Sequence, residues 1–189
     1  DWFQDTEVNS SGELILFADH LRDERDTNYI DVALRFSAPV QAVSFRINDV
    51  DLGDNGSGAN FWEDVIENIR ADYQGTPVNT GYVTNVGSGI TIDTTSEPGD
   101  TLYRGNENMA WNKPSQMTVN WDDPITAFSY RYSSGENAIW NPNGQVIGMS
   151  GVKFDLYQPV PEPGTVIGGV LALGALFLVE RRRRARLRQ

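Results

Sequence analysis

The sequence predicts an all-β protein, in which an antiparallel β-sandwich is followed by a single C-terminal transmembrane helix. Short stretches rich in β-branched and aromatic residues recur between clusters of Gly, Asn, Asp and Pro, which is typical of sandwich folds. Apolar residues within these stretches alternate with polar ones, as on strands with one solvated face. Near the C-terminus, residues 165–179 carry no charge, and a group of arginines follows. A chain of 189 residues fits one ordinary domain with such an appendage.

The composition excludes several classes of protein. Without cysteine, the chain has no disulfide framework, thiolate metal site or cysteine nucleophile. A net charge of −11 opposes nucleic acid as a partner, because phosphate binding depends on Lys and Arg. The one histidine, His20, stands in a charged stretch, which favours a solvated side chain over a catalytic one. Five Trp, seven Tyr and eight Phe are enough to form a core, so disorder is not expected.

Nine segments of the acidic body have the composition of strands. They are residues 13–17, 29–37, 42–48, 65–71, 78–83, 89–93, 116–121, 125–132 and 152–157. The segment 62–71 is ambiguous, because Val65, Ile66 and Ile69 also fit the spacing of one helix face.

Charge divides the chain into two parts. From residue 160 onward, six arginines and two glutamates give the tail a net charge of +4. The preceding 159 residues hold nine basic and 24 acidic side chains, a net charge of −15. An acidic body joined to a basic tail indicates two compartments.

The uncharged run 165–179 is the predicted membrane helix. At 1.5 Å per residue it covers about 22 Å, less than the ~30 Å hydrocarbon core, and snorkelling arginines and local thinning can close the gap. A buried core helix is the alternative that the short length favours. Its place at the chain end and the cluster that follows it favour the membrane, since positive residues beside an apolar helix stay cytoplasmic. The cluster consists of Arg181, Arg182, Arg183 and Arg184.

A short motif precedes this helix. Pro161, Glu162 and Pro163 come first, then the apolar run, then the arginine cluster. In this order and at the chain end, the three parts resemble the PEP-CTERM sorting signal of Gram-negative bacteria. Two prolines around one acid keep the segment extended, as a protease substrate must be. A plain stiff linker is the alternative, and both interpretations can hold together.

The resemblance implies how the protein is sorted. It implies export and recognition of the tail by a membrane exosortase that cuts near the motif. We therefore expect an extracytoplasmic body at 1–158, a linker with the sorting motif at 159–164, the transmembrane helix at 165–179 and a cytoplasmic basic tail at 180–189. The body is expected first in the periplasm, anchored to the inner membrane, and then at the cell surface or in the extracellular matrix. Since export needs a targeting signal, we expect the sequence to begin either after the cleavage site of a signal peptide or at an arbitrary boundary within a longer chain.

The body carries a second resemblance, which is looser. Its segments 36–40, 43–51, 64–65, 124–130 and 145–154 are similar to the jelly-roll ectodomains of secreted bacterial surface proteins. In those proteins the last apolar strand follows a loop flanked by glycine. The resemblance spans about residues 10 to 158 and supports a jelly-roll-like architecture more than any activity.

One acidic loop is a candidate Ca²⁺ site. Asp49, Asp51, Asp54 and Asp64 bring several hard oxygens together, and Ca²⁺ takes six to eight of these. The spacing is not that of an EF-hand, because Asn60 stands where the closing glutamate belongs. A solvated turn is the alternative, since turns prefer Asp, Asn and Gly for their own reasons.

Two loop tryptophans are candidates for stacking on a sugar ring. Trp111 precedes an Asn-Lys-Pro sequence, and Trp140 lies in a stretch rich in Ser, Gly and Asn. A flat apolar face with polar edges suits a sugar, and binding residues concentrate on loops. Burial in the core is the alternative, as for most tryptophans of a sandwich.

Three functions remain open at this stage. The first is an exported surface or matrix protein of biofilms whose body binds exopolysaccharide without catalysis. The second is a structural or adhesive subunit that associates with copies of itself or with other surface proteins through strand edges. The third is a secreted glycoside hydrolase, which needs a pair of carboxylates that no apolar setting singles out here. We expect no enzymatic activity.

Overall fold

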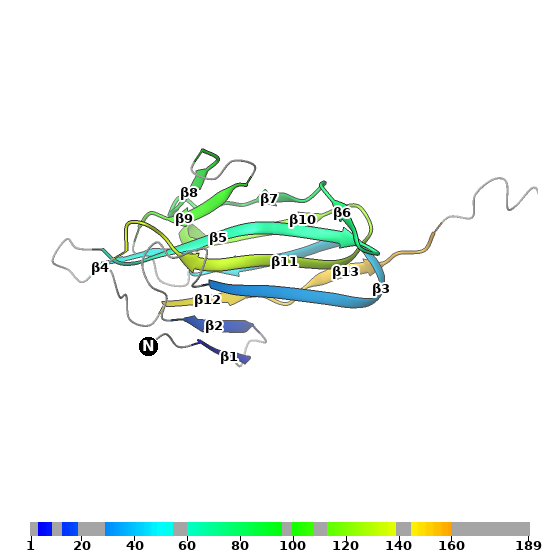
Figure 1. The fold of residues 1–189 in the computed structure, drawn as a ribbon, viewed down its shortest axis with the longest axis horizontal. Helices are drawn as coiled ribbons and strands as arrows, with labels where there is room; N and C mark the ends of the chain where they lie inside the picture. Colours follow the sequence, from blue (N-terminus) through cyan, green and yellow to red (C-terminus); the bar gives the residue numbers. More distant parts are fainter. Residues whose placement is uncertain are drawn as a thin grey trace, which may run out of the picture. The chain divides into compact units, whose positions relative to one another are not determined.

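The computed structural model describes residues 4–8, 13–18, 29–54, 60–95, 100–107, 113–138 and 145–159. Within these ranges the protein is all-β, and every strand pairing is antiparallel (Figure 1). Tertiary contacts divide the chain into two compact units, Asp1–Tyr157 and Gln158–Gln189. All the described strands belong to the first unit. No helix in the described ranges has the length and apolar character needed to cross a membrane.

Thirteen strands and one short 3₁₀ turn follow one another along the described chain. They are β1 Gln4–Val8, β2 Leu14–Ala18, β3 Tyr29–Asn48, β4 Leu52–Asp54, β5 Asn60–Tyr73, β6 Thr76–Val78, β7 Tyr82–Thr84, β8 Ile90–Asp93, β9 Leu102–Gly105, η1 Lys113–Ser115, β10 Met117–Trp121, β11 Ile125–Ser134, β12 Gln145–Met149 and β13 Lys153–Leu156. The main hydrogen-bonded path runs β1-β2-β12-β3-β11-β5-β9-β8.

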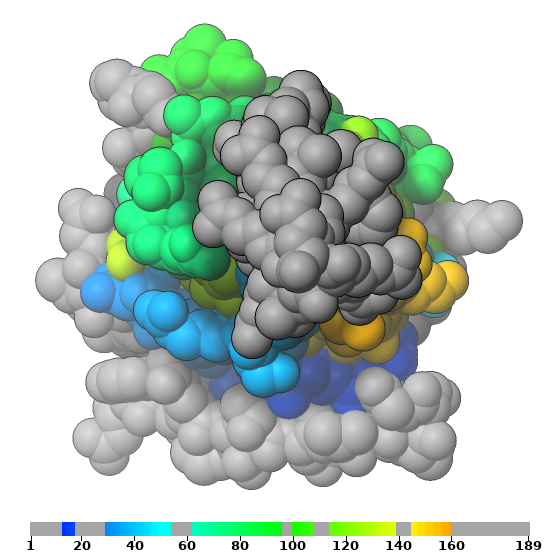
Figure 2. Space-filling model, turned by 90° about the vertical axis from the view of Figure 1, so that its right-hand side faces the viewer, coloured from blue at the N-terminus to red at the C-terminus, as the bar shows by residue number. Residues whose placement is uncertain are grey.

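The long strand β3 belongs to two layers. Its first part, up to Val40, pairs with β11, which in turn pairs with β5. Its second part, around Ser44, pairs with β10 on one side and β13 on the other. Ala42, between the two parts, has a φ of 50°, and this left-handed backbone locally bends the strand. At the end of the body where β3 bends, β3 and β13 both reach the surface (Figure 2).

The core lies between these layers. Phe45 in the second part of β3 stacks on Phe128 of β11, with the ring centroids 4.7 Å apart. Trp121 of β10 stacks on the same Phe128 at 5.5 Å. Strand β10 pairs with the second part of β3 and with β7, whereas β11 pairs with the first part of β3 and with β5. The rings of Phe45 and Trp121 therefore contact the ring of Phe128 across two layers. The fold is therefore β-sandwich-like.

The all-β class predicted from the sequence is confirmed, and several element boundaries differ from prediction. Segment 62–71 lies within β5, so the helical alternative is wrong. Its helix-like spacing has a local cause: at Asn68, φ is 53° and the register with β11 shifts, so an extra residue interrupts the alternation. Segments 29–37 and 42–48 form one bent strand rather than two. None of the nine segments predicted as strands covers β1, β4, β9 or β12. The predicted membrane helix lies outside the described residues.

Candidate functional site

Three of the four predicted metal ligands lie close together. Asp49 and Asp51 stand in the connection from β3 to β4, and Asp64 lies in β5, the strand that pairs with β4. The backbone N–H of Asp64 donates to the carbonyl of Asp51 at 2.9 Å. Asp49 has a φ of 67°, a left-handed conformation that Asp tolerates better than most residues. All three side chains are buried, and Asp64 is fully so. The side chain of Asp54 lies outside the description.

Hydrogen bonds fix two of these carboxylates. Asp64 accepts from the hydroxyl of Tyr132 at 2.8 Å on Oδ1 and from the backbone N–H of Asp51 at 3.2 Å on Oδ2. The side-chain amide of Gln145 donates to the same Oδ1 at 3.5 Å. Asp51 in turn accepts from the indole N–H of Trp62 at 2.7 Å. The cluster is therefore held by strands β5, β11 and β12 together.

Burial and mutual repulsion keep protons on this cluster. Burial raises the pKa of Asp49 to about 7, with a further contribution from the negative charge of Asp51. Burial also raises the pKa of Asp64 well above its usual range, and the neighbouring Asp51 adds to the effect. The pKa of Tyr132 is likewise raised by burial and by Asp64. The Tyr132 hydroxyl therefore remains protonated and can donate its hydrogen bond at all physiological pH values.

The described cluster does not by itself complete a cation site. No group of three Asp, Glu, His or Cys side chains in the described ranges is arranged to hold a metal ion. Two nearby buried amides nevertheless have oxygens that accept no hydrogen bond in the described structure, Oδ1 of Asn48 and Oε1 of Gln145. A cation here would need ligands beyond Asp49, Asp51 and Asp64.

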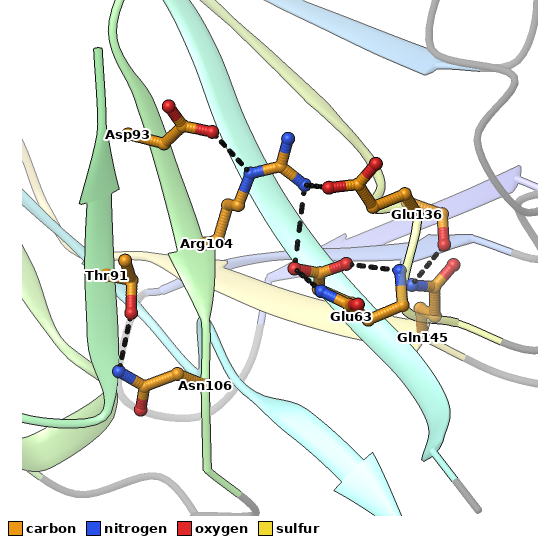
Figure 3. A network of polar contacts seen from close by, with 9 residues as sticks. Glu63, Thr91, Asp93, Arg104, Asn106, Glu136 and Gln145 are labelled. Carbon is orange, nitrogen blue, oxygen red and sulfur yellow. Dashed lines mark hydrogen bonds and ion pairs between the residues drawn. The ribbon is translucent and has the colours of Figure 1, made fainter. Parts of the chain in front are cut away.

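A second buried polar cluster centres on Arg104 of β9, and no sequence motif indicates it. Its guanidinium lies 3.3 Å from Asp93, 3.6 Å from Glu63 and 3.9 Å from Glu136 (Figure 3). Glu63 also accepts hydrogen bonds from the backbone and side-chain amides of Asn137, at 2.8 and 3.1 Å. The buried carboxylate of Glu63 therefore has both a cation, Arg104, and hydrogen-bond donors from Asn137, as a buried charge requires. We assign the cluster a structural role that ties β5, β8 and β9 to the turn after β11.

Tight backbone packing joins the two clusters. A Cβ added to Gly105, the residue after Arg104, would overlap the backbone carbonyl of Asp51. Only glycine therefore allows β9 to approach the connection that carries Asp49 and Asp51.

Several predicted site residues fall outside the described ranges. These are Trp111, Trp140, the sorting motif Pro161, Glu162 and Pro163, and the arginines Arg181 to Arg184. Among the described aromatics, Trp121 is a core residue and Trp62 is bound to Asp51. Tyr82 of β7 and Phe154 of β13 are the exposed aromatic residues of the described ranges, at 42% and 46%, and the sequence pattern did not distinguish either from the other aromatics.

Comparisons with known proteins bring no relative to this fold or site. No family model, curated protein or solved structure matches the chain.

Proposed function

We propose that the chain is an exported surface or matrix protein of a biofilm, sorted by an exosortase, whose jelly-roll-like body binds exopolysaccharide without catalysis. The observation that carries the proposal is the order of parts at the C-terminus. The last described strand, β13, ends at Leu156, and Pro161, Glu162 and Pro163 follow within a few residues of the sequence. The uncharged run and the arginine cluster complete the signal. Proline on both sides of Glu162 disfavours a helix there, and a protease requires an extended substrate.

The character of the body supports a binding role. In the described part of the chain, five acidic side chains and one arginine are buried. Hydrogen bonds between strands hold Asp64, and Glu63 is held by an ion pair with Arg104 and by hydrogen bonds from Asn137. Such groups stabilise a scaffold rather than present a nucleophile. The outward faces of β7 and β10 instead carry hydroxyl and amide groups, as on Thr84, Thr118 and Asn120. Groups of this kind match the hydroxyls of a sugar.

Self-association is a second candidate, favoured by one edge strand. Strand β8 lies at the end of the sheet path and pairs with β9. Ile92 of this strand is 52% exposed. An apolar side chain on an unprotected edge is the device by which sheets of two molecules pair.

We also propose that the acidic loop binds Ca²⁺ once Asp54 is added to Asp49 and Asp51. Two buried carboxylates that repel one another gain from a cation between them. Asp64 already accepts a hydrogen bond from Tyr132, so it would position the loop rather than bind the cation directly.

The sorting proposal is tested with the full chain in a host with and without an exosortase. Replacing Pro161, Glu162 and Pro163 with alanine should keep the protein in the inner-membrane fraction at its original mass. The unchanged chain should lose mass and leave that fraction only when the exosortase is present. Asp155→Ala, at an exposed acid of β13, is the control and should be processed normally. Equal processing of the motif variant and the unchanged chain would contradict the proposal.

The binding proposal is tested separately, by retention of the full chain in detergent on immobilised polysaccharides. The panel includes the polysaccharide purified from the producing cells and neutral and acidic polymers of defined composition. We expect retention on at least one of them, without release of reducing sugar. No retention on any member would overturn the glycan-binding function and leave self-association.

A further inference from the structure

A groove of about 760 Å³ lies on the outer face of the layer that contains β3, β10 and β13. Its volume is within the range of small-molecule sites, which is about 300–1,000 Å³. The side chains that line it come from several segments far apart in the chain: Glu13, Ser44, Arg46, Thr118, Ser150 and Lys153. The segments meet here because β3 pairs with both β10 and β13.

The strand register places the lining side chains on one face. Along β3, Ser44 and Arg46 alternate with the buried Val43, Phe45 and Ile47, so the first two point away from the core. Opposite Arg46 stands Thr118 of β10.

Neighbouring positions form a row across four strands. Lys153 of β13 is opposite Ser44 of β3, Ser44 is opposite Asn120 of β10, and Asn120 is opposite Tyr82 of β7. With strands about 4.8 Å apart, such a row is roughly 14 Å wide. It is wide enough to accommodate more than one sugar ring.

The polar groups of this face are fixed before a ligand arrives. Ser150 accepts a hydrogen bond from the backbone N–H of Arg46 at 2.8 Å. Asn120 donates to the hydroxyl of Thr84 at 3.0 Å. The hydroxyl of Tyr82 donates to Asp122 at 3.0 Å, which holds an exposed ring at the end of the row. Fixed groups of this kind reduce the entropy lost on binding.

The charge of the groove is opposite to that of the body. Arg46 and Lys153 both line it, whereas the 159 residues before the tail carry a net charge of −15. The described structure gives neither of these two side chains an ion pair or hydrogen bond, in contrast to Arg104 and Arg131. Of the nearby acids, Glu13 accepts from the side-chain amide of Asn48 at 2.7 Å. At physiological salt, charges beyond about 8 Å are screened, so a ligand senses mainly Arg46 and Lys153 with Glu13, a local net charge of +1 against the negative charge of the body.

Building on the proposed glycan-binding function, we propose that this groove binds a carboxylate-bearing polysaccharide. Arg46 and Lys153 pair with the carboxylates of uronate units, since cations beside a carboxylate form the stronger, charge-assisted hydrogen bonds. Ser44, Thr118 and Asn120 contact ring hydroxyls. Tyr82 offers its ring to an apolar sugar face.

The test compares two forms of one polymer, polygalacturonate and its fully methyl-esterified, neutral counterpart, by titration calorimetry on the full chain in detergent. We expect the ester to bind at least tenfold more weakly than the acid. The double variant Arg46→Gln with Lys153→Gln should lose at least tenfold in affinity for the acid. The matched control is Arg35→Gln with Arg70→Gln, which removes the same charge from a hollow of about 280 Å³ elsewhere on the sheet. It should change the affinity less than twofold.

Three outcomes overturn the inference and differ in what they leave standing. If the neutral ester or another neutral polymer binds as well as the acid, glycan binding stands and the acidic ligand is wrong. If the control variant loses affinity and the groove variant does not, the acidic ligand stands and the groove is wrong. If no polysaccharide of the panel is retained, the glycan-binding function fails together with this inference. Circular dichroism of both variants verifies that they are folded.

Discussion

The hydroxyl of Tyr132 donates a hydrogen bond of 2.8 Å to Oδ1 of Asp64, and both side chains are fully buried. Tyr132 comes from β11 and Asp64 from β5, so the bond links two neighbouring strands beneath the acidic loop. A buried carboxyl oxygen without such a donor would bear its full desolvation cost.

Replacing Tyr132 with phenylalanine should therefore destabilise the body. Asp64 would lose a buried hydrogen bond, which corresponds to about 1–3 kcal/mol in the free energy of unfolding. Urea unfolding followed by tryptophan fluorescence measures the change. Tyr130→Phe is a matched control, because its hydroxyl is also buried and has no hydrogen-bond partner in the described structure. The control should be neutral or stabilising, and equal losses in the two variants would contradict the assigned role of Tyr132.

Replacing Arg104 with methionine should lower the free energy of unfolding more than Tyr132→Phe does. The substitution keeps much of the side-chain volume and leaves the buried Glu63 without its cation, at a cost of about 3–5 kcal/mol. Arg131→Met tests the same change at an exposed pair, since Arg131 binds Asp31, whose side chain is 56% exposed. That pair should contribute about 0–1 kcal/mol. Similar unfolding midpoints for the two variants would show that Arg104 is not a structural centre.

The fold class was predictable because it depends on local patterns, whereas the connections between elements were not. Alternation in segments such as 116–121 indicates a strand wherever the strand lies. The bend of β3 at Ala42 depends on which strands flank it. Alanine is not a residue type that indicates a left-handed φ, so the sequence does not predict the bend. The helix-like spacing around Asn68 misled for a related reason, since a bulge is visible only in the register with a partner strand.

The candidate site was predictable in part for the same reason. Asp49, Asp51 and Asp64 are near in sequence, and a hairpin between them was enough to bring them together. The partners of Arg104 come from β5, β8 and the turn after β11, and only the completed sheet brings them within reach. The groove at Arg46 and Lys153 likewise depends on β3 pairing with strands much later in the chain.

The raised pKa of Asp49 predicts that stability decreases as the pH rises. Its pKa is about 7 in the folded chain against an ordinary value of 3.8. Between these values the folded state holds a proton that the unfolded state has released, so the free energy of unfolding falls with increasing pH. The contribution is complete below about pH 4 and lost above about pH 7. The raised pKa of Asp64 acts in the same direction.

Urea unfolding in chelator, between about pH 5 and pH 8, measures this effect. Asp49→Asn should flatten the profile and be more stable than the unchanged chain at the alkaline end. Asp155→Asn, at an exposed acid of β13, should leave the profile as it is. A free energy of unfolding that rises over this pH range would show that the buried carboxyls ionise without cost.

Calcium should reverse this pH dependence if the acidic loop binds it, because a cation favours the ionised carboxylates that burial disfavours. At about ten times the dissociation constant, a ligand adds about 1.4 kcal/mol, or about 3–6 °C in the unfolding midpoint of a body of this size. Extracellular sites bind near 10⁻⁴–10⁻³ M, so about 10 mM Ca²⁺ against chelator is the suitable comparison. The rise should be larger at about pH 8 than at about pH 6, where protons compete. Asp51→Asn and Asp54→Asn should each abolish it, and Asp155→Asn should not. An unchanged midpoint in the native chain at alkaline pH would exclude a calcium site there and assign Asp49, Asp51 and Asp64 to a proton-holding structural cluster.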